Sequence, residues 1–289
     1  MNTNSKEPAF SPPLPIDRFL ESKEQVFIYD DLRQFEHFLY TYLSNRNLLD
    51  GPIGLQLSSS NELVFLIAAC WRLGIPFIAF DAATTPDKLS KQLKRTKAAA
   101  LISDKKLGSL QAETHVIPSD TFSLTKILEP DFTPNKSIKR RKEEVQSNQD
   151  RIWGYFFTSG TTGSPKIVPL KRRQMLFAAK ASAQNLQPDR NSLWLLCMSL
   201  HHIGGITVII RSLLYGTGIY RLHRFESSSV TQLFFENPRL QAASLVPTML
   251  KRLLDRSEFT APDYFKAILL GGGPVSESLI DCCFERGIP

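Results

Sequence analysis

The sequence predicts an α/β protein built on doubly wound, mostly parallel β-sheets. Short apolar runs alternate with longer amphipathic stretches along most of the chain, which is typical of βαβ units. Several of these runs end in clusters of Gly, Ser or His that lead straight into the next helical stretch. In addition, 289 residues of which 42% are hydrophobic and 22% charged are enough to bury a large core.

For the first half of the chain, the sequence predicts an N-terminal tail followed by alternating strands and helices. Residues 1–26 are polar and rich in proline, so we expect an extended tail there. The segment Ser58–Asn61 offers N-cap residues, and Gly74 is a typical stop signal for the apolar helix between them. The predicted elements are helices at 27–49, 62–72 and 86–95 and strands at 53–57, 76–80 and 98–102.

The second half continues the alternation after a polar interval. Residues 103–150 carry little apolar periodicity, and the basic sequence KRRK within 130–150 favours a solvated connector over a nucleic-acid patch. We expect two α/β subdomains, at 27–150 and 151–289. The later elements are strands at 193–198, 216–222, 241–245 and 267–270 and helices at 171–185, 206–214, 226–237, 249–256 and 275–286.

The chain is organised around Trp153–Leu170, where an apolar strand stops at the loop TSGTTGSPK. Glycines let backbone N–H groups face a ligand, the hydroxyls add donors and Lys166 adds a charge. Unlike a Walker loop, this one leads into the strand-like residues Ile167–Pro169 rather than a helix. We therefore predict a hairpin whose loop binds a polyphosphate. The alternative is an ordinary surface turn rich in Ser, Thr and Gly.

TSGTTGSPK resembles the phosphate-binding signature of the adenylate-forming superfamily, which includes acyl- and aryl-CoA ligases, luciferases and the adenylation domains of peptide synthetases. The resemblance implies the layered, doubly wound N-terminal domain of those enzymes. It also implies that the loop holds the phosphates of ATP. The residues implied in that contact are Thr158, Ser159, Gly160, Thr161, Thr162, Gly163 and Lys166.

A second segment, Ser199–Gly205, resembles the superfamily's aromatic-His-x-x-Gly element. His202 takes the place of the histidine that borders the acyl pocket, whereas His201 stands where an aromatic residue is usual and Ser199 where proline is usual. Taken alone, two adjacent histidines at a strand end are more often structural. Because no third ligand follows at a suitable spacing, we predict no metal site in this chain.

Two more segments support the resemblance. Gly271–Gly273 with Pro274 corresponds to the turn against which the superfamily places adenine and ribose; the alternative is a tight strand-to-helix turn of any α/β fold. SLVPTMLKRLL is similar to the same stretch of the o-succinylbenzoate–CoA ligases of menaquinone biosynthesis. That similarity places Ser244 and Pro247 beside the substrate.

The resemblance implies an acid–CoA ligase that uses ATP, Mg²⁺ and coenzyme A, with Lys166 and His202 as catalytic residues. It also implies a fragment, because the superfamily's later motifs and its small C-terminal domain do not follow within this sequence. We therefore expect the chain alone to turn over very little. Other acyl-CoA synthetases, amino-acid adenylation domains and a nucleotide-binding or interaction module without catalysis are the alternatives.

Charge and composition limit the partners. The formal charge is +7, but the basic clusters at 91–97 and 136–142 lack interleaved aromatics, which favours mild steering of anions over nucleic-acid binding. The apolar stretch 63–80 is broken by Arg72, Gly74 and Pro76, so no membrane span is expected. Four cysteines without a C-x-x-C pair, and no signal peptide, predict a cytoplasmic protein. A monomer and a homodimer both remain open.

Overall fold

We describe the fold from a computed structural model, which describes residues 13–108, 110, 114–128, 136–158, 166–256 and 259–289. The chain forms two compact units. Unit 1 comprises the residues up to Tyr29 together with Ala178–Ser199 and Gly204–Pro289, and unit 2 comprises Asp30–Phe177 and Leu200–Ile203. Within the described residues, each unit is built on one six-stranded sheet.

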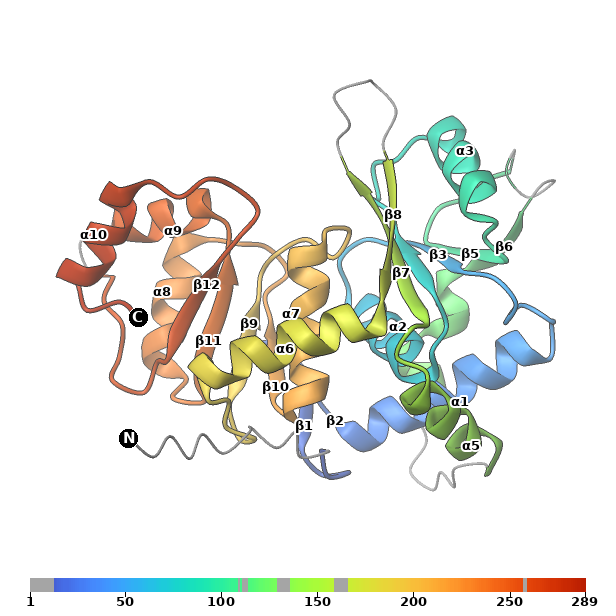
Figure 1. Ribbon diagram of the computed structural model, residues 1–289, viewed down its shortest axis with the longest axis horizontal. Coiled ribbons are helices and arrows are strands. Elements are labelled where there is room, and N and C mark those ends of the chain that lie inside the picture. Colours follow the sequence, from blue (N-terminus) through green and yellow to red (C-terminus); the bar gives the residue numbers. More distant parts are fainter. Residues whose placement is uncertain (1–12, 109, 111–113, 129–135, 159–165, 257–258) are drawn as a thin grey trace. The chain divides into compact units, whose positions relative to one another are not determined.

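The sheet of unit 2 has the strand order β6-β5-β3-β4-β7-β8. The chain enters at β3, adds β4 on one side and then returns to add β5 and β6 on the other, a reversal typical of doubly wound folds. These strands are parallel except for β8, which runs antiparallel to β7 (Figure 1). Their bounds are β3 (Ile53–Gln56), β4 (Phe77–Ala79), β5 (Ala100–Ser103), β6 (His115–Pro118), β7 (Ile152–Thr158) and β8 (Lys166–Lys171).

The helices of unit 2 include the three predicted ones, together with a 3-10 turn and two helices that were not predicted. They are α1 (Tyr29–Ser44), α2 (Asn61–Leu73), α3 (Pro86–Thr96), a short 3-10 turn (Ser119–Phe122), α4 (Leu124–Ile127) and α5 (Lys136–Ser147). Helix α2 lies in the core and begins and ends where expected: the Ser60 side chain accepts a hydrogen bond from Leu63 N at 3.3 Å, and Gly74 is a left-handed C-cap.

Helix α5 was not predicted, because its sequence reads as a polar connector. The structure anchors it to unit 2 at three points: Val145 is buried, Lys142 pairs with the buried Glu36, and Arg141 Nε donates to Leu73 O at 2.9 Å. Lys139 and Arg140 remain exposed. The basic KRRK sequence is thus divided between solvent and structural contacts.

Unit 1 repeats the strand crossing of unit 2. Its sheet has the order β12-β11-β9-β10-β1-β2: when the chain returns to unit 1 after β8 it enters at a central strand, β9, and adds β10 on one side and β11 and β12 on the other. The pair β1–β2 lies at the edge beyond β10, as the hairpin β7–β8 lies beyond β4. The strands are β1 (Arg18–Glu21), β2 (Val26–Ile28), β9 (Leu193–Leu196), β10 (Gly218–Arg221), β11 (Leu240–Leu245) and β12 (Ala267–Leu270). The chain passes from unit 2 to unit 1 within helix α6 (Arg172–Leu186). The helices that follow are α7 (Ile203–Tyr215), α8 (Ser227–Glu236), α9 (Pro247–Leu254) and α10 (Glu277–Glu285).

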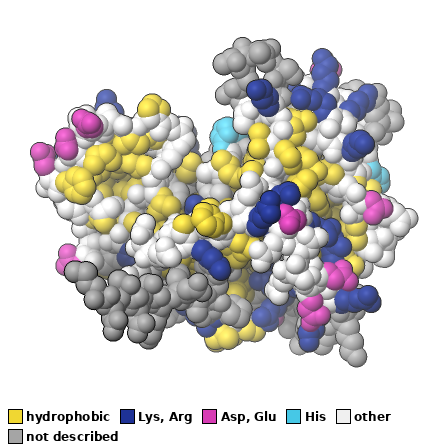
Figure 2. All heavy atoms as spheres, viewed as in Figure 1, with side chains coloured by type: hydrophobic (Ala, Val, Ile, Leu, Met, Phe, Trp, Pro, Cys, Tyr) yellow, Lys and Arg dark blue, Asp and Glu magenta, His cyan; other side chains and the backbone are white. Residues whose placement is uncertain are grey.

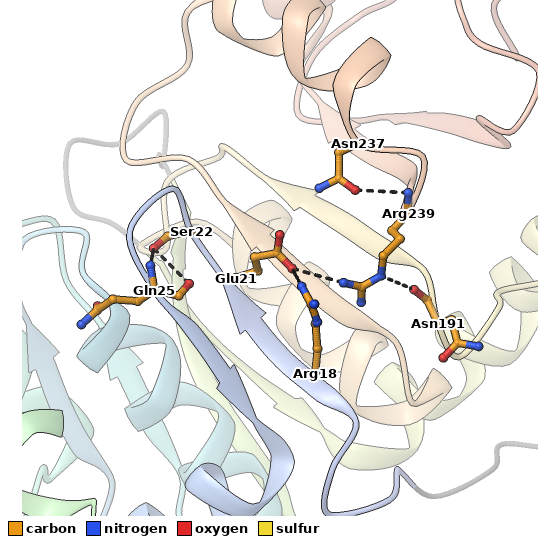
Figure 3. A network of polar contacts seen from close by, with 7 residues as sticks. All are labelled: Arg18, Glu21, Ser22, Gln25, Asn191, Asn237 and Arg239. Atoms are coloured by element: carbon orange, nitrogen blue, oxygen red, sulfur yellow. Dashed lines mark hydrogen bonds and ion pairs between the residues drawn. The ribbon is translucent and has the colours of Figure 1, made fainter.

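The segment 1–26 was expected to be an extended tail, but its second half contains strand β1, which pairs in parallel with β10. Phe19 and Leu20 are fully buried. Figure 3 shows the polar contacts that hold this strand: Glu21 accepts from Arg18 Nη1 at 2.6 Å and from Arg239 Nη1 at 3.3 Å. A four-residue strand next to a proline-rich segment offers too little alternation to be predicted.

The division into units also differs from the boundary expected after residue 150. Strand β7 pairs in parallel with β4, and β8 extends the same sheet, so the hairpin belongs to unit 2. Sequence order alone suggested that the hairpin opened the second subdomain. Strand pairing decides membership of a sheet, and that pairing joins segments far apart in the chain.

On the face that Figure 2 shows, basic side chains (dark blue) gather over α3 of unit 2. This helix buries Leu89 and Leu93 and exposes the cations Lys88, Lys91, Lys94 and Arg95. Among the residues that the structure describes, no helix combines the length and the apolar character that crossing a membrane requires.

Candidate functional site

The predicted hairpin is present, and its two strands meet at the ends of the candidate phosphate loop. Thr158 is the last residue of β7 and pairs with Lys166, the first residue of β8. Both are exposed. The predicted loop residues Ser159, Gly160, Thr161, Thr162 and Gly163 lie outside the described residues. The structure therefore places the two ends of the loop, including its lysine, on an antiparallel pair of strands (Figure 1).

An aromatic cluster fixes the base of this hairpin. Trp153 is 1% exposed and packs edge-on against Trp71, with ring centroids 5.5 Å apart. The Arg172 guanidinium lies 3.9 Å above the Trp71 ring and donates from Nη1 to Trp71 O at 2.6 Å. Burial lowers the pKa of Arg172 to about 10, which leaves it charged at neutral pH. Nearer the loop, Phe157 stacks on Phe80 at 6.0 Å. These contacts restrict where Thr158 and Lys166 can lie.

The two predicted histidines lie together in unit 2. The ring centroids of His201 and His202 are 4.1 Å apart, and His201 Nε2 is 3.7 Å from Asp81 Oδ2. Burial and the neighbouring His202 lower the pKa of His201, and Asp81 partly offsets them. His201 is therefore neutral near pH 7. His202 is exposed, as a residue that meets a ligand must be.

The second glycine after the histidines permits a close backbone approach. A Cβ atom at Gly205 would lie 2.4 Å from the carbonyl oxygen of Ser199, so no larger residue fits at that turn. The turn begins α7 directly after the histidines. It lies at the carboxyl side of β9, which is where doubly wound folds bind ligands.

The glycine-rich turn lies at the carboxyl end of β12 in unit 1. Gly272 has φ +80°, and a Cβ atom at Gly273 would be 3.7 Å from Pro247 Cδ. The structure therefore brings the turn against Pro247, the first residue of α9. Gly271 to Pro274 are exposed, and a Cβ atom at Gly271 would meet nothing within 4 Å. The open backbone could accept a flat ring.

Ser244 lies in the interior of unit 1. It is 6% exposed, and its hydroxyl accepts a hydrogen bond from Trp194 Nε1 at 3.1 Å. The Trp194 ring in turn stacks on Tyr215. This geometry gives Ser244 an interior structural role, in contrast to the substrate contact expected from the resemblance.

Sequence reasoning missed Asp81 and Arg172. Asp81 follows the carboxyl end of β4, so the general position of ligands in parallel sheets could have drawn attention to it. Arg172 gave no signal, because its partner Trp71 lies in another helix far earlier in the chain. A small cavity lined in part by Trp194, Thr217 and Lys266 opens at the amino ends of the strands of unit 1. The glycine turn, in contrast, lies at the carboxyl ends of these strands.

Comparisons with known proteins agree on one family. The model of the family described as "AMP-binding enzyme" matches residues 16–289. The 2-succinylbenzoate–CoA ligase of Enterococcus faecalis is 28% identical over 274 residues, which cover 94% of this chain and 52% of that protein. The enzyme of the same name from Bacillus pumilus is 28% identical over 268 residues, covering 92% and 53%. The chain thus spans about half the length of the curated relatives it matches.

Solved structures show the same fold. The o-succinylbenzoate coenzyme A synthetase of Bacillus subtilis, in complex with ATP and magnesium ion, superposes with a TM-score of 0.79 and 24% identity, covering 95% of this chain and 56% of that one. ATP-bound MatB from Rhodopseudomonas palustris gives a TM-score of 0.77 and 18% identity over 94% and 55%. These likenesses confirm the predicted fold class.

Proposed function

The chain belongs to the AMP-binding enzyme family, and from this premise we propose that it is the N-terminal part of an ATP-dependent acid–CoA ligase of menaquinone biosynthesis that activates 2-succinylbenzoate. The observation that carries the proposal is the hairpin: a loop of the sequence TSGTTGSPK begins at the exposed Thr158 and ends at the exposed Lys166. The names of the two curated relatives described above support the choice of acid.

The proposed reaction has two steps. A carboxylate oxygen of the acid attacks the α-phosphorus of ATP, pyrophosphate leaves and an acyl-adenylate forms. The sulfur of coenzyme A then attacks the acyl carbon, its proton is lost and AMP leaves. Neither step needs a covalent bond to the protein, so orientation and charge stabilisation are the protein's contribution.

Each part of the chain has a role in that scheme. Lys166 and Thr158, with the loop between them, hold the phosphates. The exposed turn Gly271–Pro274 with Pro247 takes the adenine and ribose, and His202 lines the acid site. Mg²⁺ is implied by the family. In the part of the chain that the structure describes, however, no group of three or more His, Cys, Asp or Glu side chains is placed to hold a metal ion. We therefore derive no step through it.

The test is the affinity for ATP with Mg²⁺, measured by titration calorimetry on the 289-residue chain. Lys166→Ala removes a charged contact worth about 1.5–3 kcal/mol, which corresponds to roughly 10- to 150-fold weaker binding. Lys171→Ala is the matched control, since Lys171 is the last residue of the same strand and pairs with the exposed Asp150. Equal ATP affinity in Lys166→Ala and wild type would overturn the phosphate assignment.

The choice of acid needs a separate measurement. Thermal unfolding is followed with 2-succinylbenzoate, a fatty acid and amino acids in turn, each with ATP and Mg²⁺. We expect stabilisation by 2-succinylbenzoate, and we expect His202→Ala to remove that stabilisation while keeping the one due to ATP. Stabilisation by fatty acids or amino acids alone would reject this substrate but keep the family.

We also propose that the protein acts in the cytoplasm. All four cysteines are unpaired, and Cys70, Cys197 and Cys283 are buried. Burial raises the pKa of the Cys70 and Cys197 thiols to about 12, which keeps them protonated and unreactive. Unpaired, inert thiols suit a reducing compartment.

A further inference from the structure

The loop after β4 carries a carboxylate that the scheme above does not use. Asp81 is the second residue beyond that strand and is half exposed. Its Oδ1 accepts a hydrogen bond from Ala83 N at 2.8 Å, and its Oδ2 lies 3.7 Å from His201 Nε2. One carboxylate oxygen is thus used to shape the loop, and the other faces an imidazole.

Neighbouring strands fix the loop that carries this carboxylate. Gln56, fully buried at the end of β3, donates from Nε2 to Thr84 O at 3.0 Å. Lys105, just beyond β5, donates from Nζ to Ala82 O. Asp81 is therefore presented by a loop that is tied to β3 and to the segment just after β5, and such support is what holds a functional side chain in place.

From Asp81 the contacts lead outward to His202. His201 is 27% exposed and lies between the carboxylate and the His202 ring, whose centroid is 4.1 Å away at an angle of 54°. At that separation the two imidazoles are in van der Waals contact. A change in the orientation of the His201 ring must therefore be felt by His202, which is exposed.

The charges favour one form of His201. The ring is neutral near pH 7, because burial and His202 lower its pKa and Asp81 only partly offsets them. A carboxylate accepts hydrogen bonds and cannot donate them, so it favours the tautomer with the proton on Nε2, the nitrogen that faces it. At 3.7 Å the attraction is electrostatic rather than a full hydrogen bond.

We propose that Asp81 is a positioning residue for His202 and that it acts through His201. Its carboxylate sets the orientation and tautomer of the His201 ring, and that ring supports the His202 imidazole from one side. The inference rests on the proposed function only in assigning His202 to the acid site. The superfamily's usual aromatic residue at position 201 could pack in the same place but could not respond to a carboxylate.

The first test is ¹⁵N NMR of the histidine rings in the 289-residue chain. Asp81→Asn keeps the size of the side chain and removes its charge. We expect a lower pKa for His201, a smaller share of the Nε2-protonated tautomer, and shifted ring signals for His202. Asp81→Glu restores the charge and returns the His201 tautomer toward wild type. Asp50→Asn, an exposed carboxylate outside this group, is the control and changes none of these signals.

A double-mutant cycle shows whether the effect passes through His201. In a His201→Phe background, which retains a ring but no titrating nitrogen, we expect Asp81→Asn to leave the His202 signals unchanged. The proposal is overturned if Asp81→Asn alters His201 without altering His202, if it alters neither, or if it still alters His202 in the His201→Phe background. Asp81→Ser, which also removes the charge but keeps an oxygen that can accept from Ala83 N, gives the same decision should Asp81→Asn unfold the chain.

Binding separates this inference from the proposed function. With ATP and Mg²⁺ present, we expect Asp81→Asn to weaken binding of 2-succinylbenzoate several-fold and to leave the affinity for ATP unchanged. Unchanged affinity for the acid in this variant would overturn the positioning role. If the wild-type chain does not bind 2-succinylbenzoate at all, the proposed substrate fails, while the NMR cycle still decides whether Asp81 acts on His202.

Discussion

Glu36 is a single buried charge that ties three helices of unit 2 together. It lies on α1, is fully buried, and pairs with Arg72 on α2 and Lys142 on α5. Burial lowers the pKa of Lys142, and the Glu36 carboxylate opposes that change. A buried carboxylate with two cations is costly to disrupt from one side, because the charges that remain lose their partner.

Glu36→Gln should therefore destabilise the chain by about 3–5 kcal/mol, the range observed when one member of a buried ion pair is removed. The measurement is urea unfolding followed by circular dichroism. Glu144→Gln is the control, because Glu144 and its partner Arg140 are both largely exposed and such pairs contribute at most about 1 kcal/mol. Similar losses in the two variants would show that the Glu36 cluster is not structural.

His201 predicts a pH effect on stability. Its pKa is lowered in the folded chain, so below about pH 6.5 the unfolded chain binds more protons than the folded one. Above that pH the ring is neutral in both states and its titration does not affect the free energy of unfolding. As the pH falls below it, protons bind preferentially to the unfolded chain and the free energy of unfolding decreases. His201→Phe should therefore lose less stability than wild type between pH 7.5 and pH 5 in urea unfolding. Parallel pH profiles of the two proteins would contradict this.

At the scale of single residues, the sequence predicted the groups that follow a local pattern. Lys166, His202 and Gly271–Gly273 belong to short motifs and lie exposed at strand ends, where they were expected. Asp81 and the buried role of Ser244 were missed. Both depend on partners, His201 and Trp194, that are distant in sequence, and no local pattern encodes such a pairing.

At the scale of elements, the sequence predicted the helices and strands that have clear local start and stop residues, and it did not predict those that lack them. Helix α2 begins at its Ser60 cap and ends at Gly74 as predicted, since both residues have a local physical role. Strand β1 and helix α5 were not predicted, because their side chains become buried only through contacts with segments distant in the sequence. Phe19 is covered only once β1 joins β10, and Val145 only once α5 lies on unit 2.

The glycine turn after β12 can be tested as an element by two matched substitutions. Gly271→Ala adds a methyl group that meets nothing within 4 Å, so stability should change by less than about 0.5 kcal/mol. Gly272→Ala forces a side chain to φ +80° and should cost about 1–2 kcal/mol. If adenine lies on this turn, Gly271→Ala should still weaken ATP binding in calorimetry. Unchanged ATP affinity in that folded variant would show that the adenine ring does not lie on this turn.

At the scale of the whole molecule, the two units share one plan. In each, a run of parallel strands begins at a central strand and extends to both sides of it, and an antiparallel pair lies at one edge. The sequence predicted alternating strands and helices. It could not show that β7–β8 completes the earlier sheet and β1–β2 the later one, because each pair joins a strand remote from it in the chain.

Part of the net charge of +7 is carried by α3, a helix that packs against strand β7 of the hairpin. The buried side of α3, Leu89 and Leu93, packs in one cluster with Tyr155 and Phe157 of β7. Its outer side exposes the four cations named above. A helix with its side chains is about 10–12 Å wide, close to the Debye length of about 8 Å at physiological salt. These charges are therefore near enough to attract an anion approaching the hairpin.

Charge reversal on α3 should consequently slow the arrival of ATP without releasing it faster. For Lys91→Glu with Lys94→Glu, stopped-flow fluorescence with a labelled ATP should show an association rate several-fold lower at low salt, a dissociation rate like that of wild type, and convergence of the two proteins as salt is raised. Lys139→Glu with Arg140→Glu makes the same change of net charge on the exposed side of α5 and should have a smaller effect. Steering is rejected if both double variants slow association equally or if the α3 variant changes only dissociation. Tight DNA binding that falls steeply with salt and is lost in the α3 variant would assign these cations to nucleic acid instead.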